Sequence, residues 1–268
     1  MINQIDNYFW FKLNGFLRYS LIHTSGKFLP LYIVNEYPKS GGSWVGEMLG
    51  DALEVPFPRN KLPEFRSSII HGHMMHSWNM HNVLIVWRDG RDVLISQYYH
   101  MLFNNDKGNS ELVRKTRSQL EFHDYSDIKR NLPKFMEYIY TDKKNVRISW
   151  VDFFNKWHKC NKCIHTRYED LRKDPVKEIS KIIGKLNNEK EIDNHKIKKI
   201  VDKYSFVNMS GRDPGQENNA SFMRKGIVGD WKNYFSLESR IQFNKYAEKA
   251  IYELGYEKDD KWIFSNEN

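Results

Sequence analysis

The sequence predicts an α/β fold in which helices flank a central parallel sheet in three layers. Four short apolar runs of strand length are separated by longer segments whose apolar residues recur every three or four positions. Strands that alternate with helices in this way are typical of parallel sheets, because each return to the same edge requires a crossover. The expected strands are residues 31–37, 68–71, 83–87 and 163–168.

The segments between and after these strands carry helical patterns. The expected helices are residues 44–53, 91–103, 127–140, 151–159, 175–186, 191–203 and 238–254. Residues 104–126 are polar and irregular and are expected to form a loop. A chain of 268 residues can bury one sizeable core, and no part of it reads as a linker, a repeat or a low-complexity tract. We therefore expect a single domain over residues 1–268.

Residues 1–28 are expected to form an amphipathic helical segment packed on this domain. The apolar residues of one helical face are Phe9, Leu13, Phe16, Leu17 and Leu21. Polar residues interrupt every apolar run here, so the segment is neither a membrane-spanning helix nor a signal peptide. A helix that lies on a membrane surface is the alternative. Because no secretion signal is found, the sequence suggests a cytoplasmic protein.

The most informative stretch runs from Tyr37 to Trp44 and reads Tyr-Pro-Lys-Ser-Gly-Gly-Ser-Trp. It lies between an expected strand and an expected helix, where backbone N–H groups and the positive end of the helix converge on an anion. Lys39 adds a charge, and Ser40 and Ser43 add hydroxyl donors. In a Walker A loop the lysine follows the glycines. Lys39 precedes them, so this is not an ordinary ATP-binding loop.

This order resembles the 5′-phosphosulfate loop of the sulfotransferases that use 3′-phosphoadenosine 5′-phosphosulfate (PAPS), the cytosolic type and its bacterial relatives. The family pattern is roughly Tyr-Pro-Lys-Ser-Gly-Thr-Thr-Trp. Here Gly42 and Ser43 replace the two threonines; Ser43 keeps a hydroxyl, whereas Gly42 offers only its backbone N–H. The resemblance implies a P-loop-like fold and these PAPS-binding residues: Lys39, Ser40, Gly41, Gly42, Ser43 and Trp44.

Arg88 follows the expected strand 83–87, at the edge where open parallel sheets bind ligands. The segment resembles the family's 3′-phosphate site, in which an arginine and a serine eight positions later hold the phosphate; Arg88 and Ser96 have this spacing. A guanidinium offers a bidentate fork to a dianion, and a serine hydroxyl adds one more bond. Without the resemblance, an ion pair of Arg88 with Asp89 or Asp92 would be preferred.

Three further segments are assigned to the nucleotide by resemblance. Residues 224–233 match the family's C-terminal signature Arg-Lys-Gly-x-x-Gly-Asp-Trp-Lys-Asn. Its cations, Arg224 and Lys225, and then Gly226 suit a flexible loop that folds over a polyanion; the alternative is a solvated basic loop. Tyr168, in a Tyr-Glu-Asp-Leu-x-x-Asp-Pro element, is expected near adenine, with a core tyrosine as the alternative. Phe206 is expected to stack on one face of adenine, with the loop tryptophan on the other.

The segment His71-Gly72-His73 fills the frame in which the family has Lys-x-His after a strand. His73 takes the position of the catalytic base, with a structural histidine as the alternative. His71 replaces the family lysine, which helps to neutralise the sulfuryl group in the transition state. Either a protonated His71 serves in its place, or Lys39 acts alone.

The resemblance spans about residues 30–255 and implies in-line transfer of a sulfuryl group from PAPS to a hydroxyl acceptor, with 3′-phosphoadenosine 5′-phosphate (PAP) as product. Lys39 and the loop N–H groups stabilise the leaving group, so no metal is needed. A P-loop nucleotide kinase is one alternative, which the position of Lys39 disfavours. A non-catalytic nucleotide- or lipid-binding module is another, which the position of His73 disfavours.

The acceptor is a small-molecule, glycan or lipid hydroxyl that the sequence does not define. The aromatic residues that would suit an apolar acceptor, or form core, are Trp78, Tyr98, Tyr99, Phe103 and Phe122. Residues 104–126 are expected on the acceptor side. The oligomeric state is open, because the family's dimer motif Lys-x-x-x-Thr-Val-x-x-x-Glu fits loosely here and has Ile241 in place of its glutamate.

The net charge of +8 indicates an anionic partner. No nucleic-acid-binding signature is present, and much of the charge lies in residues 181–203, which read as solvated helix faces. A bound nucleotide accounts for the rest. Four residues have zinc-ligand chemistry at close spacing: His158, Cys160, Cys163 and His165. Since Cys163 begins an expected strand, a neighbouring strand would crowd a metal there, and a structural role is preferred.

Overall fold

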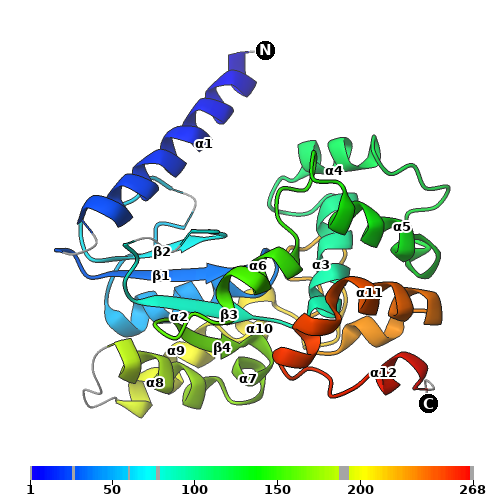
Figure 1. Ribbon diagram of the computed structural model, residues 1–268. Coiled ribbons are helices and arrows are strands. Elements are labelled where there is room, and N and C mark those ends of the chain that lie inside the picture. The colour runs from blue at the N-terminus through cyan, green and yellow to red at the C-terminus, as the bar shows by residue number, and fades with distance from the viewer. Residues whose placement is uncertain (1, 26–27, 60, 77–78, 187–192, 266–268) are drawn as a thin grey trace. The chain divides into compact units, whose positions relative to one another are not determined.

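Figure 1 shows a computed structural model of the chain, which describes residues 2–25, 28–59, 61–76, 79–186 and 193–265. Within these residues, four strands form one parallel sheet in the order β2-β1-β3-β4. The strands are β1 Leu31–Glu36, β2 Ser68–Gly72, β3 Val83–Trp87 and β4 Ile164–Arg167. Each lies where the sequence placed it, and the expected α/β fold with helices flanking a parallel sheet is confirmed.

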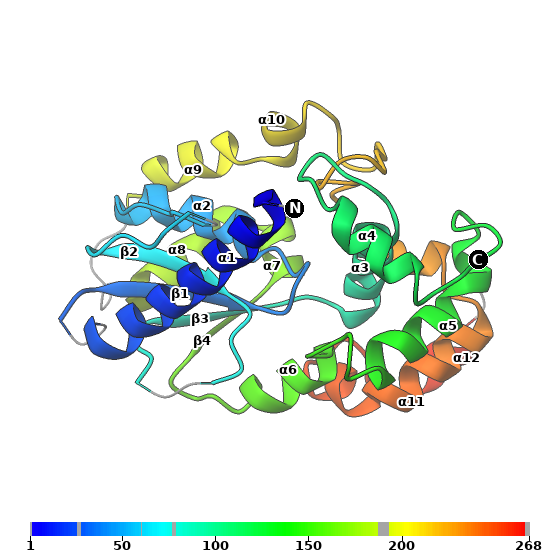
Figure 2. The ribbon, with the colours of Figure 1, turned by 90° about the horizontal axis from the view of Figure 1, so that it is seen from above.

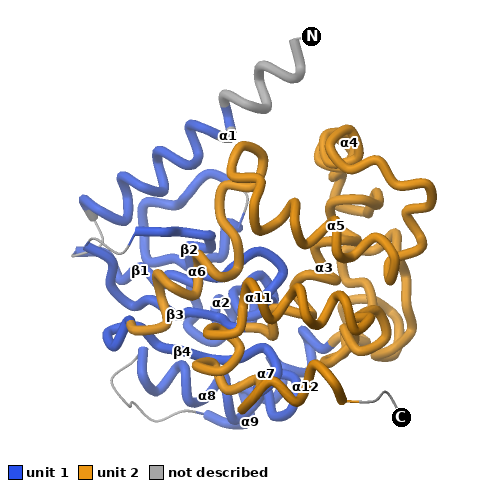
Figure 3. Tube along the Cα trace, turned by 45° about the vertical axis from the view of Figure 1, so that its right-hand side comes forward, with its two compact units in different colours: residues 1–87, 160–205 blue, residues 88–159, 206–268 orange. Residues whose placement is uncertain are grey.

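The chain divides into two compact units, coloured separately in Figure 3. The first unit comprises residues 1–87 and 160–205, and the second comprises residues 88–159 and 206–268. Helices of the first unit are α1 Ile2–Ser20, α2 Gly42–Leu53, α7 Tyr168–Lys173, α8 Pro175–Leu186 and α9 Asn194–Lys203, with a π-helical turn, Leu21–Ser25, after α1. Helices of the second unit are α3 Gly90–Leu102, α4 Ser110–Arg117, α5 Ile128–Thr141, α6 Trp150–Trp157, α10 Phe206–Ser210, α11 Leu237–Glu253 and α12 Lys261–Phe264, with a 3-10 turn, Asp230–Asn233.

The strand order places a switch point in the sheet, because β1 has β2 on one side and β3 on the other. In open α/β sheets, ligands bind outside the carboxyl ends of the strands at such a point. The turn after β1 therefore lies where a nucleotide site is expected from topology alone.

Both faces of the sheet are buried. Val34, Leu84 and Ile69 pack on one face against α2, α8 and α9, which lie together beside the sheet (Figure 2). On the other face Ile33 and Ile85 are also at most 1% exposed. Fully burying an aliphatic side chain stabilises a fold by about 1.5–3 kcal/mol relative to leaving it exposed. This two-sided burial is the reason that the strands read as continuous apolar runs.

The second unit is built around α3, α5, α6 and α11. Gly90, the first residue of α3, lies so close to Trp150 that a Cβ on Gly90 would come 2.8 Å from the indole ring. Arg91 is buried, with its guanidinium 3.9 Å from the ring centroid of Trp231 and 4.7 Å from that of Trp262. The first turn of α3 is thereby held within its own unit.

Residues 104–126 are more regular than expected, because α4 occupies part of the segment. The buried residues of α4 are Val113 and Thr116. One apolar and one polar residue at this spacing make too weak a helical pattern to recognise in the sequence. Side chains hold the helix in place: Arg117 donates to the carbonyl of Leu102 at 2.6 Å, and Asn109 donates to the carbonyls of the turn before it.

Helix α1 occupies the expected N-terminal segment. Arg18 donates to the backbone carbonyls of Lys61 at 2.9 Å and of His71 at 3.2 Å, which ties the end of α1 to the sheet. Phe16 is 65% exposed, so the apolar face of α1 is covered only in part within this unit. Some of the expected segment, including the side chain of Phe9, lies outside the described residues. No helix among the described residues is long and apolar enough to cross a bilayer.

Candidate active site

The turn between β1 and α2 carries the residues expected to hold the 5′-phosphosulfate. Lys39 and Gly41 take left-handed backbone conformations, with φ of 77° and 98°. Such a conformation is strained for lysine, and observed strain of this kind is concentrated at functional turns. Gly41 gives α2 no side-chain cap, and Ser43 lies in the first helical turn. Ser40 is 1% exposed, and its Oγ has no hydrogen-bond partner among the described residues, which suits an anion-binding turn.

Aromatic residues surround this turn. Tyr168, the first residue of α7, lies against Gly41, where a Cβ would come 2.7 Å from the tyrosine ring. The ring centroids of Trp44 and Tyr168 are 5.9 Å apart, and Trp44 Nε1 donates to the carbonyl of Tyr204 at 2.7 Å. The structure therefore brings two of the three rings expected at adenine to the loop; their contact with adenine stays a prediction.

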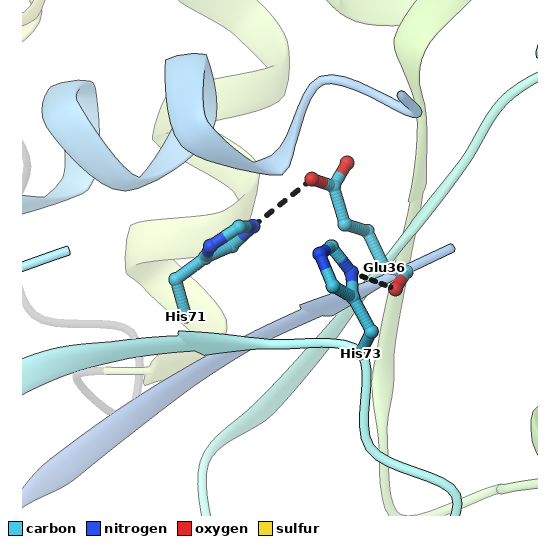
Figure 4. A group of neighbouring side chains, drawn as sticks. All are labelled: Glu36, His71 and His73. Atoms are coloured by element: carbon cyan, nitrogen blue, oxygen red, sulfur yellow. Dashed lines mark hydrogen bonds and ion pairs between the residues drawn. The ribbon is translucent and has the colours of Figure 1, made fainter. Parts of the chain in front are cut away.

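His71 and His73, at the end of β2, both lie beside Glu36 at the end of β1. The parallel register sets Val34 opposite His71, which places Glu36, two residues further along β1, beside His73. Glu36 Oε1 lies 2.9 Å from His71 Nε2, and the carbonyl oxygen of Glu36 lies 2.9 Å from His73 Nδ1 (Figure 4). One glutamate therefore contacts both histidines, with its carboxylate on one and its backbone on the other.

These contacts define the free nitrogen of His73. A carbonyl oxygen only accepts, so His73 Nδ1 carries a proton and donates to Glu36. Nε2 is then the basic nitrogen of the neutral ring. Part of His73 is exposed, but the loss of hydration on its protein side lowers its pKa, against the opposing charge of Glu36. A neutral, accessible imidazole is what a general base requires.

Glu36 is a buried carboxylate that sequence reasoning missed. It is 4% exposed. Burial by itself would raise the pKa of Glu36, but the hydrogen bond and charge of His71 and the N–H of Gly42 hold the pKa below its ordinary value. One signal was available in the sequence: Glu36 is a charged residue at the end of an apolar strand. A glutamate that is fully buried is almost always paired, so a partner for Glu36 could have been sought.

Gly42 is required by the volume of Glu36. A Cβ on Gly42 would lie 2.7 Å from Glu36 Cδ. We expect Gly42→Ala to lower the free energy of unfolding by about 1–3 kcal/mol, measured by chemical denaturation, because overpacking at a filled site forces side chains to shift. The same change in a Glu36→Ala background should cost much less, since the obstructing carboxylate is gone. Equal costs in the two backgrounds would contradict this account.

Among the described residues, one group has the chemistry of metal ligands: Glu36, His71 and His73. One donor atom from each lies within 4.8 Å of the others. Two imidazoles and a carboxylate are ligands that zinc accepts. In this structure the carboxylate instead accepts from His71 and from the N–H of Gly42.

Arg88 and Ser96, expected at the 3′-phosphate, belong to the second unit. Arg88 precedes Asp89, the N-cap of α3, and Ser96 lies on that helix. The sequence left open an ion pair of Arg88 with Asp89 or Asp92. In the structure Asp89 pairs with Arg91 at 2.7 Å. Burial raises the pKa of Asp92, and the charge of Arg88 acts against this rise.

Arg224 and Lys225 pair with carboxylates of their own unit. Both contact Asp230, Lys225 at 2.7 Å, and Arg224 also pairs with Glu217. Burial alone would raise the pKa of Asp230, but bonds from both cations lower it, so it stays ionised. Their side chains are 14% and 17% exposed, so the alternative of a solvated basic loop is wrong.

Two other parts of the C-terminal signature are placed by contacts within the second unit. Gly226 has φ of 64°, and a Cβ there would lie 2.3 Å from the ring of Phe206. The loop and the ring expected at adenine are therefore adjacent. Asp92 of α3 accepts the backbone N–H groups of Gly229 at 2.7 Å and Trp231 at 2.9 Å.

Cys160 and Cys163 form a disulfide, so they do not offer two thiolates to zinc. His165 Nδ1 accepts from Trp87 Nε1 at 2.9 Å, and its Nε2 lies 2.9 Å from the carbonyl oxygen of Cys160. The spacing of these residues therefore serves a local structural role.

Among the aromatic residues considered for the acceptor, Tyr98 belongs to the core. It is 0% exposed, and its hydroxyl donates to the carbonyl of Tyr125 at 2.9 Å. Phe122 lies almost parallel to Tyr98 at 6.4 Å. Trp78 lies outside the described residues.

Comparison with known proteins decides the family. The family model of the sulfotransferase domain matches residues 71–255, more than half of the chain. The chain belongs to this sulfotransferase family. The resemblance seen in the motifs is thereby confirmed, as is the expectation of an enzyme of the PAPS-dependent class. The match begins at His71, so the assignment of the preceding loop rests on its own residues and geometry.

Individual sulfotransferases are similar over most of the chain. Mouse sulfotransferase 1B1 is 27% identical over 267 residues, which cover 82% of each chain. Rabbit amine sulfotransferase is 28% identical over 188 residues, 65% of this chain and 55% of that one. The mouse sulfotransferase SULT7A1, solved in complex with PAP, is 19% identical with a TM-score of 0.60 over 88% of each chain. A retinol dehydratase solved with retinol and PAP is 16% identical with a TM-score of 0.55, over 86% of this chain and 84% of that one. At these identities, the solved structures show the fold alone.

Proposed function

We propose that this sulfotransferase moves the sulfuryl group of PAPS to a hydroxyl acceptor and leaves PAP as product. One observation carries the proposal: a phosphate-type turn with the buried Ser40 Oγ follows β1, and the neutral His73 follows the adjacent β2. Donor site and base are thus held at neighbouring strand ends of one unit. In-line transfer requires this proximity.

Each residue of this site has a task in the proposal. Bound PAPS supplies an activated sulfuryl group on a phosphate leaving group. Lys39 and the N–H groups at the start of α2 stabilise the charge that gathers on the leaving oxygen. The hydroxyls of Ser40 and Ser43 hold the 5′-phosphate. His73 Nε2 accepts the proton of the acceptor hydroxyl.

The remaining cofactor-binding residues are assigned to the ends of the nucleotide. Arg88 and Ser96 hold the 3′-phosphate, and Arg224 and Lys225 exchange Asp230 for phosphate oxygens. The residues assigned to adenine and to close backbone approach are Tyr168, Phe206, Trp44, Gly41, Gly42 and Gly226. The proposed acceptor is a small-molecule, glycan or lipid hydroxyl, and a cytoplasmic location is kept as part of the proposal.

The proposal is tested with sulfur-labelled PAPS and a panel of sterols, phenols, sugars, lipids and small natural products. Label transfer to at least one hydroxyl, without added magnesium, is the expected result. A binding measurement separates the kinase alternative: PAP should bind more tightly than ATP. A preference for ATP and magnesium would contradict the proposal.

Arg88→Ala should weaken the binding of PAP about tenfold or more, because a charge-assisted contact contributes ~1.5–3 kcal/mol. Binding of adenosine 5′-phosphate, which lacks the 3′-phosphate, should change little. Calorimetry with the two nucleotides measures the difference. If both nucleotides lose affinity equally, Arg88 does not hold the 3′-phosphate.

A further inference from the structure

We propose that Glu36 is a positioning residue that keeps His71 protonated, so that His71 supplies the positive charge for which the family pattern has a lysine. The inference rests on the proposed function and deepens it. It assigns a role to a residue outside the recognised motifs, and it resolves which of the two histidines is the cation and which is the base.

Two departures from the family pattern meet at this residue. Gly42 stands where the pattern has threonine, and His71 stands where it has lysine. In the structure the missing Cβ of Gly42 makes room for the Glu36 carboxylate, which accepts from the N–H of Gly42 and lies 2.9 Å from His71 Nε2. A threonine at position 42 would overlap the carboxylate, so the contact between Glu36 and His71 requires the glycine at position 42.

Glu36 and His71 form a nearly buried pair, with 2.9 Å between Oε1 and Nε2. The carboxylate side chain is 5% exposed and that of His71 is 11% exposed, so water screens the pair weakly. A buried carboxylate without a counter-charge is costly, and a proton on His71 neutralises it. Two further titratable groups contact His71: His73, from the same segment, and Arg18 of α1, which donates to its backbone carbonyl.

Lost hydration and a charge on His71 keep His73 neutral, against the charge of Glu36. His73 contacts the backbone carbonyl of Glu36 and not its carboxylate. The two rings are 5.2 Å apart, so a charge on His71 opposes a second charge on His73. The pair therefore divides into one imidazolium and one imidazole, a cation for the sulfuryl oxygens and a base for the acceptor.

Glu36→Gln tests the inference, since it keeps the shape and removes the charge. We expect turnover at pH 8 to fall about 10²-fold, the loss typical of one electrostatic contact in a transition state. The loss should be smaller at pH 6 than at pH 8, because the charge of a neighbouring carboxylate matters less where protons are more abundant. A Glu36→Gln variant with wild-type turnover at pH 8 would overturn the inference.

A lysine at position 71 provides the matched rescue. The double variant Glu36→Gln, His71→Lys carries its own charge, so it should regain most of the lost turnover and lose the extra sensitivity to high pH. If Glu36 only shapes the turn through the N–H of Gly42, the lysine rescues nothing, and that outcome overturns the inference. Circular dichroism and PAP affinity establish that each variant is folded.

Two measurements on the wild-type chain need no activity. In ¹⁵N-histidine NMR, His71 should remain an imidazolium at a pH where His73 is neutral, with assignments from His71→Lys and His73→Ala; a neutral His71 overturns the inference. Titration with Zn²⁺ should give no site that depends on Glu36, His71 and His73. If Zn²⁺ binds stoichiometrically and each of Glu36→Gln, His71→Lys and His73→Ala abolishes this binding, the group is a metal site and the inference is overturned. Failure of every acceptor in the transfer assay, with the NMR result intact, would instead count against the proposed function.

Discussion

Replacing His73 with alanine is expected to lower turnover with an unactivated alcohol by ~10²–10⁴-fold, the usual contribution of a general base. The affinity for PAP should stay nearly unchanged, because the basic Nε2 of His73 is assigned to the acceptor proton while the turn after β1 holds the donor. Steady-state kinetics at saturating PAPS and calorimetry with PAP measure the two effects separately.

The nature of the acceptor gives this prediction its control. An acidic phenol is already partly ionised and needs less help from a base, so the loss in His73→Ala should shrink with such an acceptor. His71→Ala should impair both acceptors alike, since a cation acts on the sulfuryl group. The opposite pattern would mean that the two histidines exchange roles. If neither variant loses activity, the base lies elsewhere, and His76 and His100 are the next to test.

The pH dependence follows from the direction of the His73 shift. Its pKa is lowered, chiefly by lost hydration, and the ring must be neutral to accept a proton. Activity should therefore persist as pH falls below about 6.5, the ordinary value for histidine, and be lost only at the lower pKa. The acid limb of kcat/KM against pH measures it. An acid limb above that value would contradict a base in this environment.

Much of the sheet and its site was predictable, because the signals are local. Each strand is a buried apolar run. The turn from Tyr37 to Trp44 is recognisable by its glycines, hydroxyls and lysine in a fixed order. Parallel topology then places the turn after β1 and the histidines after β2 at adjacent strand ends. The first step needs only local sequence, whereas the adjacency of β1 and β2 comes from the structure.

The unpredicted features depend on contacts distant in sequence. Glu36 reads as a polar residue at a strand end, and only the register of β1 with β2 shows that its carboxylate serves His71. Likewise the sequence shows Arg224 and Lys225 as a free basic pair, whereas Asp230 and Glu217 pair with them in the structure. A local pattern reveals which charges are present, but their partners appear only when the chain is folded.

Lys39→Ala should lower turnover by about 10²–10³-fold while changing PAP affinity only modestly. The φ of 77° at position 39 is equally unfavourable for lysine and alanine, so the substitution removes the ammonium group without new backbone strain. In the proposal that group acts mainly on charge that grows as the S–O bond breaks, and interactions of this kind appear in turnover rather than in ground-state binding. Single-turnover kinetics with saturating PAPS isolate the transfer step, and Lys39→Arg, which keeps a charge, should lose less. Normal turnover in Lys39→Ala together with weak PAP binding would show that the turn only holds the nucleotide, and the charge at the leaving oxygen would then fall to the α2 N–H groups and His71.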